Sequence, residues 1–411
     1  MVHPAPIVDL AGALGRLYAR IPLGMRLGLE PMRDACARED HPERAFATVH
    51  VAGTNGKGSV SAMVEAIARA HGMKTGLFTS PHLCRFAERI RIDGEPIDDA
   101  TLAAALDRAL DGAPDLSFFE TATLAAFLAF REARVDLAVI EVGIGGRLDA
   151  TNVVPCPRAA AITRIAFDHM DRLGSTLEAI AREKAGIAKP GLDIVVGAVA
   201  EGPRAAIDAV ARAAGATTSE PIPEYAGAIG IPGDYQRDNA RVAATLGERI
   251  GASPAAISRG IADVRWPGRL ERIGPVLLDA AHNPDGAEAL ARHVRSLGIA
   301  PARVSVVFGA LADKDWRPML DAIAPLGGTR VYLAPQGGSR AGIDPGDLVA
   351  RHDGTVAGSV REAIARAARG GPSGPGDGGS AELVVVAGSL VLAGEARAEL
   401  LGLPRDPPVA L

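Results

Sequence analysis

The sequence has 411 residues, of which 48% are hydrophobic and 23% are charged, and its formal net charge is −5. This length exceeds what one hydrophobic core usually supports, so we expect two domains. The near balance of acidic and basic residues excludes a basic nucleic-acid-binding protein and a disordered acidic chain.

The cysteines and the apolar stretches predict a cytoplasmic protein. Cys36, Cys84 and Cys156 lie far apart, which argues against a disulfide framework and against a cysteine-based zinc site. The first residues lack the basic region and apolar run of a secretion signal. The longest apolar stretch, residues 383–394, is too short to span a bilayer. We therefore expect no membrane partner.

The first 265 residues alternate apolar runs of strand length with helical patterns. Strands are expected at residues 46–51, 76–79, 137–142, 159–163 and 194–196. Helices are expected at residues 59–70, 120–133 and 177–188, where apolar residues recur at three- and four-residue spacing. This alternation predicts a mainly parallel sheet with helices on both faces.

A second α/β series follows a break at residues 265–269, where proline and glycine interrupt the pattern. Its strands are expected at residues 276–279, 304–308, 331–334 and 383–387, with helices beginning at Pro284 and Trp316. The sequence therefore predicts a first domain over residues 1–265 and a smaller one over residues 266–411, with a hinge near 265–269. The glycine-rich stretch 370–380 is expected to be a flexible surface loop.

A glycine-rich loop, GTNGKGS at Gly53–Ser59, joins the first expected strand to a helix. Such a loop turns backbone N–H groups toward a bound phosphate at a helix N-terminus, and Lys57 would neutralise the phosphate charge. The loop departs from the standard Walker pattern, because Gly58 separates Lys57 from the hydroxyl of Ser59. We interpret it as a polyphosphate site; an ordinary strand-to-helix turn is the alternative.

Three oxygen- or nitrogen-bearing residues follow other expected strands. Glu141 ends one strand, where a nucleotide site places a magnesium ligand. Ser80 offers a hydroxyl, although Ser-Pro is also typical of a helix start with serine as the N-cap. His169 is a metal-ligand candidate or an exposed loop histidine. The residues alone leave these alternatives open.

Lysine is rare in this chain, which draws attention to Lys184. Only five of the 44 basic residues are lysines. A position that keeps lysine where arginine is the rule suggests chemistry that needs an amine. A salt-bridged surface lysine is the alternative interpretation.

The second domain repeats the pattern of a strand that ends in a carboxylate. Asp279 ends the strand and is followed by His282 and Asn283. An acid at this position suits a nucleotide ribose or the orientation of a nucleophile, whereas Asn283 suits the N-cap of the helix that begins at Pro284.

Ten motifs occur in register between about residue 26 and residue 314. They are GTNGKGS (53–59), TSPHL (79–83), ERIRIDGEPI (88–97), FFET (118–121), EVGIGGRLDATN (141–152), DHMDRLGSTLEAIAREKAGI (168–187), QRDNA (236–240), WPGR (266–269), DAAHNP (279–284) and DKD (313–315). Together they resemble the Mur-type ATP-dependent ligases, and more closely the dihydrofolate synthase/folylpolyglutamate synthase family. The resemblance implies a P-loop ATPase domain over residues 1–265. It also implies a Rossmann-like α/β domain over residues 266–411 that completes the nucleotide and glutamate site.

The resemblance also implies roles for individual residues. The residues implied to bind ATP are Gly53, Thr54, Asn55, Gly56, Lys57, Gly58, Ser59, Asn239, Arg269, Asp279 and His282. The residues implied to hold magnesium are Ser80, Glu141, His169 and Lys184, of which Lys184 would act as a carbamate formed with CO2. The implied catalytic residues are Lys57, Glu141, His169 and Lys184. The residues implied to contact the substrate are Met25, Arg26, Leu27, Phe118, Phe119, Glu120, Thr121, Arg147, Leu148 and Asp149.

The function implied by the resemblance is ATP-dependent addition of L-glutamate to dihydropteroate and to reduced folates, in folate biosynthesis. An acyl phosphate forms first, and ADP and phosphate are released. Two magnesium ions and a monomeric enzyme are expected. The alternatives are a single-activity family member, another Mur-type amino-acid ligase, and a P-loop ATPase without ligase activity.

Overall fold

The computed structural model describes residues 9–23, 28–336, 340–370 and 380–407, and the chain divides into two compact units. Unit 1 is formed by the residues up to Ser80, by Ala87–Gly230 and by Asp238–Val264. Unit 2 is formed by Pro81–Phe86, by Ile231–Arg237 and by the residues from Arg265 onward.

Unit 1 is built on an eight-stranded sheet with the strand order β4-β3-β2-β5-β1-β6-β7-β8. The strands are β1 (Ala47–Ala52), β2 (Thr75–Phe78), β3 (Ile90–Ile92), β4 (Glu95–Pro96), β5 (Leu137–Glu141), β6 (Ala159–Ile162), β7 (Asp193–Val196) and β8 (Thr217–Ser219). All pairings are parallel except those of β3 and β4, which form an antiparallel edge. The central strands are almost continuously apolar because helices cover both faces of the sheet.

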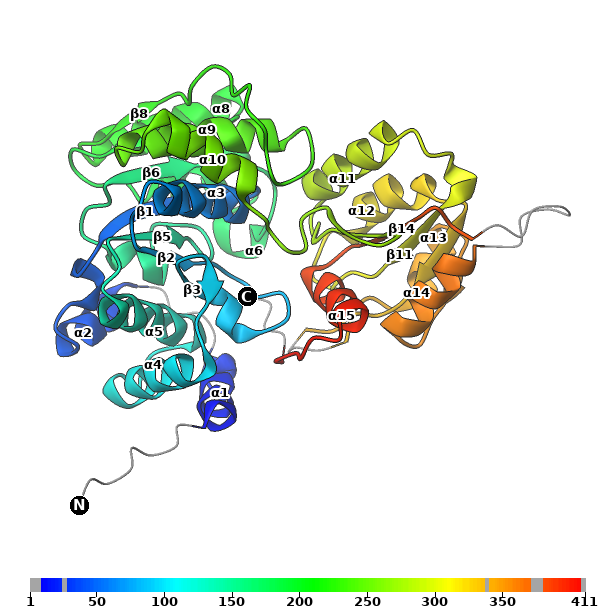
Figure 1. Ribbon diagram of the computed structural model, residues 1–411, viewed down its shortest axis with the longest axis horizontal. Helices are drawn as coiled ribbons and strands as arrows, with labels where there is room; N and C mark the ends of the chain where they lie inside the picture. The colour runs from blue at the N-terminus through cyan, green and yellow to red at the C-terminus, as the bar shows by residue number, and fades with distance from the viewer. Residues whose placement is uncertain (1–8, 24–27, 337–339, 371–379, 408–411) are drawn as a thin grey trace, which may run out of the picture. The chain divides into compact units, whose positions relative to one another are not determined.

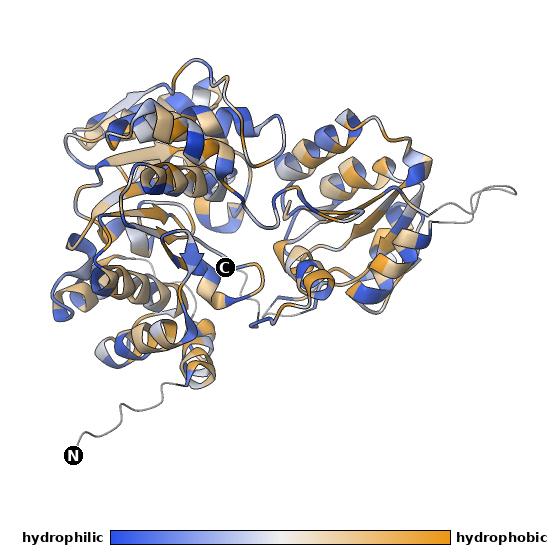
Figure 2. Ribbon diagram, viewed as in Figure 1, coloured by the Kyte–Doolittle hydropathy of each residue, from blue (hydrophilic) through white to orange (hydrophobic). Residues whose placement is uncertain are grey.

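The helices of unit 1 lie on the two faces of this sheet (Figure 1). They are α1 (Leu10–Tyr18), α2 (Glu30–Arg38), α3 (Lys57–Ala70), α4 (Asp99–Gly112), α5 (Phe118–Ala133), α6 (Met170–Leu173), α7 (Leu177–Ala185), α8 (Glu201–Ala213), α9 (Gln236–Arg249) and α10 (Pro254–Asp263). Helices α3 and α10 pack together on one face, whereas α4 and α5 pack together on the other. Hydrophobic residues concentrate on the strands and on the inner helix faces (Figure 2).

Unit 2 is built on a six-stranded sheet with the order β13-β12-β11-β14-β10-β9. The strands are β9 (Glu271–Ile273), β10 (Val276–Leu278), β11 (Val304–Phe308), β12 (Thr329–Tyr332), β13 (Thr355–Val356) and β14 (Leu383–Ala387). Only the pairing of β9 with β10 is antiparallel. Helices α11 (Pro284–Ser296) and α12 (Trp316–Ile323) contribute to the core on one face, and α14 (Val360–Arg369) and α15 (Leu390–Leu401) to the core on the other. Helix α13 (Pro345–Arg351) precedes β13.

The fold class expected from the sequence is confirmed, since both units are α/β with mainly parallel sheets. The expected strands are present within one or two residues of their expected bounds. Unit 2 is continuous from Arg265 onward and also includes Pro81–Phe86 and Ile231–Arg237, whereas the expected division into functional domains at residue 265 stays a prediction. Within the glycine-rich stretch, residues 371–379 lie outside the described residues. None of the helices in the described part of the chain has the length and apolar character that a bilayer crossing requires.

Candidate functional site

Four parallel strands of unit 1 end at the same edge of the sheet. The register pairs Val51 with Glu141, so the end of β5 lies beside the end of β1. The loops after β1, β2 and β6 begin at Gly53, Thr79 and Thr163, respectively. Ligands of open α/β sheets collect at the carboxyl ends of the strands, so this edge is where the candidate site lies.

The loop from Gly53 to Gly56 joins β1 to α3 and has no room for a side chain at either glycine. Both glycines have positive φ, +145° at Gly53 and +91° at Gly56. A Cβ atom on Gly53 would lie 1.9 Å from Oγ1 of Thr163, and one on Gly56 would lie 2.5 Å from Oδ1 of Asn239. Helix α3 begins at Lys57, and the amide groups and dipole at its N-terminus favour a bound anion at this loop.

The segment after β6 holds this loop in place. The backbone N–H of Thr54 donates to the carbonyl of Arg164 at 2.6 Å. The hydroxyl of Thr163 donates to the carbonyl of Asn55 at 2.7 Å. Thr163 was not among the residues predicted for the site, although a hydroxyl residue directly after an apolar strand, at this same edge, was the available signal.

Two lysines meet at one carbonyl oxygen of the loop. Lys57 Nζ donates to the carbonyl of Gly53 at 3.0 Å, and Lys184 Nζ donates to the same oxygen at 2.8 Å. Lys184 is 5% exposed, so it is not a surface lysine. Burial and then the charge of Lys57 lower the pKa of Lys184 to about 7, against the opposing effect of Asp168 and Asp149. A large share of Lys184 is therefore a neutral amine near neutral pH.

Ser80 and Glu141 form a second polar pair at the edge. Glu141 is 5% exposed, and its Oε2 accepts a hydrogen bond from the backbone N–H of Ser80 at 3.2 Å. The Ser80 hydroxyl is buried and has no hydrogen-bond partner among the described residues. A buried hydroxyl oxygen without a partner, next to a carboxylate, fits a hard divalent cation. Ser80 is not a helix N-cap, because no helix begins at Pro81.

His169 lies in the turn that begins α6 and has a left-handed backbone, with φ of +50°. Its Nε2 is 3.8 Å from Oδ2 of Asp168, and its backbone N–H donates to Oδ1 of that residue at 3.0 Å. Across the described ranges, no three His, Cys, Asp or Glu side chains gather in a metal-binding cluster. A metal role for His169 therefore stays a prediction.

The FFET motif forms the start of α5 and is buried. Glu120 Oε2 accepts from the backbone N–H of Ser117 at 2.8 Å, and the Thr121 hydroxyl donates to the Ser117 carbonyl at 2.8 Å. The first of these bonds belongs to the capping box of α5, in which the Ser117 side chain accepts from the backbone N–H of Glu120. Phe118 and Phe119 are 4% and 9% exposed. The polar groups of Glu120 and Thr121 thus have local partners, and their expected contact with the substrate stays a prediction.

Asp149 is also engaged by its own loop. It is 6% exposed, and its carboxylate accepts from the backbone N–H groups of Ile144 at 2.9 Å and of Thr151 at 3.0 Å. Burial raises the pKa of Asp149, and these hydrogen bonds oppose the rise. Asp149 therefore shapes the loop after β5, and its expected contact with the substrate stays a prediction.

The other expected substrate residues are placed as follows. Arg147 is exposed and forms an ion pair with Glu183 at 2.9 Å. Leu148 is half-buried. Residues 25–27 lie outside the described residues.

Asp279 is the centre of a buried polar group in unit 2. It is 2% exposed, and its carboxylate accepts from the backbone N–H groups of Leu270 and Ala281, both at 2.9 Å. The guanidinium Nη1 of Arg269 lies 3.5 Å from Oδ1 of Asp279. Burial raises the pKa of Asp279, and Arg269 opposes the rise. Burial and then the charge of Asp279 raise the pKa of Tyr235, a residue for which the sequence offered no signal.

Two other expected nucleotide residues, His282 and Asn239, are divided between the units. In unit 2, His282 Nδ1 lies 2.9 Å from the carbonyl of Ala280. Asn283 caps α11 by accepting from the backbone N–H of Gly286 at 2.9 Å, as the alternative interpretation predicted. In unit 1, Asn239 approaches Gly56 of the loop.

Comparison with known proteins places these features in a family. Residues 51–196 match the Mur ligase middle domain, and residues 268–390 match the Mur ligase glutamate ligase domain. A folylpolyglutamate synthase of Lacticaseibacillus casei is 35% identical over 408 residues, covering 88% of this chain and 92% of the relative.

Solved structures give the same result. E. coli FolC in complex with DHPP and ADP has a TM-score of 0.85 and 31% identity, with 96% of this chain and 99% of that chain covered. A bifunctional folylpolyglutamate synthase/dihydrofolate synthase of Yersinia pestis, complexed with AMPPNP and a Mn ion, has a TM-score of 0.85 and 30% identity. There the coverage is 97% of this chain and 100% of that chain.

Proposed function

This chain belongs to the folylpolyglutamate synthase/dihydrofolate synthase family of Mur ligases, and from that premise we propose how its residues carry out the reaction. The activity is that of an ATP-dependent acid–amino acid ligase that joins L-glutamate to folates. We propose that both dihydropteroate and reduced folates are acceptors, as the names of bifunctional relatives suggest.

The observation that carries the proposal is the meeting of Lys57 and Lys184 at the carbonyl of Gly53, beside the strand that ends in Glu141. The loop amides and the N-terminus of α3 bind the phosphates of ATP. Lys57 leaves the loop carbonyls and contacts the transferring phosphoryl group, where its charge is needed. Thr163 keeps the loop in its binding conformation while Lys57 moves.

Amide formation from a carboxylate and an amine is unfavourable in water, so the carboxylate is first phosphorylated. The γ-phosphoryl group of ATP passes to the acceptor carboxylate and gives an acyl phosphate and ADP. The amine of L-glutamate then attacks the acyl carbon, loses a proton and displaces phosphate. Ser80, Glu141 and His169 are the proposed magnesium ligands, and magnesium supplies positive charge to the phosphoryl oxygens when it is bound.

Lys184 is proposed to react with CO2 and to become a carbamate that supports a second magnesium ion. Only a neutral amine adds to CO2, and the lowered pKa of Lys184 provides that form near neutral pH. Arginine keeps its charge and forms no carbamate. This requirement explains why a chain rich in arginine retains a lysine here.

The proposal includes a monomeric enzyme in the cytoplasm, acting on small molecules. Within unit 2, Arg269, Asp279 and His282 are proposed to contact the nucleotide, as the resemblance implies.

Phosphate release from ATP tests the function. The purified protein is assayed with L-glutamate and with dihydropteroate or a reduced folate as separate acceptors. We expect release that depends on both glutamate and acceptor, and release with both acceptors if the enzyme is bifunctional. ATP hydrolysis that is independent of both would instead identify a P-loop ATPase without ligase activity.

Variants of the phosphate loop and of the strand end test the site. Lys57→Ala and Glu141→Ala should each abolish ligation while the circular dichroism spectrum is unchanged, because both act on bound ATP and metal. Lys74→Ala, at an exposed position, is the matched control. Normal turnover in either site variant contradicts the assignment.

Two variants test the carbamate. Lys184→Arg should be inactive, whereas Lys184→Ala should recover part of its activity when formate or acetate is added, because a small carboxylate can take the place of the carbamate. Undiminished activity of Lys184→Arg would rule the carbamate out.

A further inference from the structure

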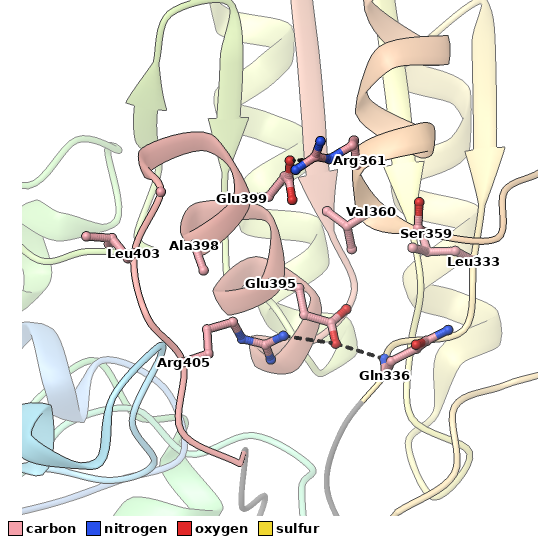
Figure 3. Close-up of a pocket in the computed structure, with 11 residues that line it drawn as sticks. Leu333, Gln336, Ser359, Val360, Arg361, Glu395, Ala398, Glu399, Leu403 and Arg405 are labelled. Carbon is pink, nitrogen blue, oxygen red and sulfur yellow. Dashed lines mark hydrogen bonds and ion pairs between the residues drawn. The ribbon is translucent and has the colours of Figure 1, made fainter.

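Unit 2 contains a cavity of about 640 Å³ that shares no residue with the candidate site described above. It lies between the loop after β12, the first turn of α14, the helix α15 and the segment that follows α15 (Figure 3). Its polar lining residues are Gln336, Ser359, Arg361, Glu395, Glu399 and Arg405. A cavity of this size accommodates a small molecule.

Glu395 projects from α15 into this cavity (Figure 3). It is only 6% exposed. Its Oε1 accepts from the backbone N–H of Gln336 at 3.0 Å and lies 3.5 Å from the guanidinium of Arg405. Its Oε2 is buried and has no hydrogen-bond partner among the residues that the structure describes. An unsatisfied buried carboxylate oxygen beside a cavity calls for a donor that a ligand supplies.

The rim of the cavity carries the opposite charge. The Arg361 side chain is 80% exposed, and its Nε pairs with Oε1 of Glu399 at 2.7 Å. Its terminal N–H groups suit a carboxylate. The lining holds two arginines, Arg361 and Arg405, and two glutamates, so its formal charges balance, which suits a ligand that is itself neutral overall. A zwitterion satisfies Glu395 and Arg361 together.

The remaining wall is apolar and is formed by Leu333, Val360, Ala398 and Leu403. We infer that this cavity binds an L-α-amino acid with an apolar side chain. The ammonium group of the ligand donates to Glu395 Oε2, and its carboxylate accepts from Arg361. Burial raises the pKa of Glu395 to about 7, against the opposing effects of Arg405 and of the Gln336 N–H. A bound ammonium group would favour the ionised carboxylate again.

Calorimetric titration of the full-length protein tests this inference without ATP, metal or folate present. The probes are L-leucine, 3-methylbutylamine, which lacks the carboxylate, and 4-methylpentanoate, which lacks the ammonium group. We expect L-leucine to bind with one molecule per chain, and each truncated probe to bind at least about tenfold more weakly, because each loses one charged hydrogen-bonding group.

Variants locate the two contacts. Glu395→Gln should weaken L-leucine binding at least about tenfold and leave 4-methylpentanoate unaffected. Arg361→Met, at an exposed position, should weaken the binding of L-leucine and leave the binding of 3-methylbutylamine unaffected. Glu288→Gln, on the exposed surface of α11, is the matched control. An unchanged ligation rate in Glu395→Gln shows that the variant is folded and that the proposed function stands apart from this site.

Three results would overturn the inference. The first is no binding of L-leucine up to about 10 mM, a concentration at which even weak sites fill. The second is equal affinity of the wild-type protein and Glu395→Gln for L-leucine. The third is an amine that binds as tightly as the amino acid, which would identify a site for simple cations.

Discussion

Replacing Lys184 by methionine should make the ligand-free protein more stable while it abolishes ligation. The side chain is buried and donates to one carbonyl oxygen, and its pKa is lowered from 10.5 to about 7. A tenfold change in a proton-binding constant corresponds to about 1.4 kcal/mol, so the charged amine costs about 4 to 5 kcal/mol. Loss of the hydrogen bond to Gly53 offsets about 1 kcal/mol of the gain.

The sign of the pH dependence follows from the direction of this shift. The unfolded chain binds the proton of Lys184 more tightly than the folded chain. The stability cost of burying the charged amine is therefore complete below pH 7. It declines as the pH rises from 7 toward 10.5. We therefore expect Lys184→Met to raise the free energy of unfolding by about 3 kcal/mol at pH 7 and by only about 1 kcal/mol at pH 9.

Urea unfolding followed by circular dichroism measures this difference. The buffers are purged of CO2 and contain no nucleotide or metal, so that the amine stays unmodified. Lys74→Met, at an exposed position, should change stability little. A Lys184→Met protein that is less stable than the wild type at pH 7, or a gain that grows with pH, would refute the reasoning.

Three further predictions concern other positions. Gly53→Ala places a Cβ atom 1.9 Å from Thr163 Oγ1. We expect kcat, measured by phosphate release, to fall at least a hundredfold, which corresponds to an activation free energy higher by about 3 kcal/mol. Ser80→Ala removes a hydroxyl that has no hydrogen-bond partner among the described residues, so the free energy of unfolding should change by less than about 0.5 kcal/mol. The magnesium concentration for half-maximal activity should rise about tenfold. Glu395→Gln should raise the free energy of unfolding by about 2 kcal/mol at pH 8 and by less than about 1 kcal/mol at pH 5. Burial raises the pKa of Glu395 from 4.5 to about 7, so the stability cost of this carboxyl accumulates as the pH rises from 4.5 to 7 and is complete above 7. A gain that is equal at both pH values would contradict this cause.

The sequence predicted the elements of the site that follow directly from strand ends. One apolar strand ends at Glu141 and another ends just before Gly53. Because the two strands are parallel neighbours, Glu141 and Gly53 lie at the same edge of the sheet. The scarcity of lysine drew attention to Lys184 but left a surface position open, and its burial in the structure excludes that alternative.

The sequence could not show which partners a buried carboxylate finds within the fold. Glu120 and Asp149 accept hydrogen bonds from their own helix start and loop, whereas Glu141 accepts from Ser80 in the loop after another strand. Which partner a carboxylate finds depends on local turns that residue type alone does not fix. The packing of Pro81–Phe86 in unit 2 was likewise hidden, because it depends on contacts distant in the chain.

The placement of Pro81–Phe86 limits how this polypeptide can be divided for experiments. Within unit 2, Leu83 and Cys84 share an apolar cluster with Ala393 and Ala398. The backbone N–H of Phe86 also donates to Asp406 at 2.7 Å. A recombinant fragment truncated at residue 265 would lack these partners and expose the surface they cover, so a workable split protein must carry the 81–86 peptide with its C-terminal half.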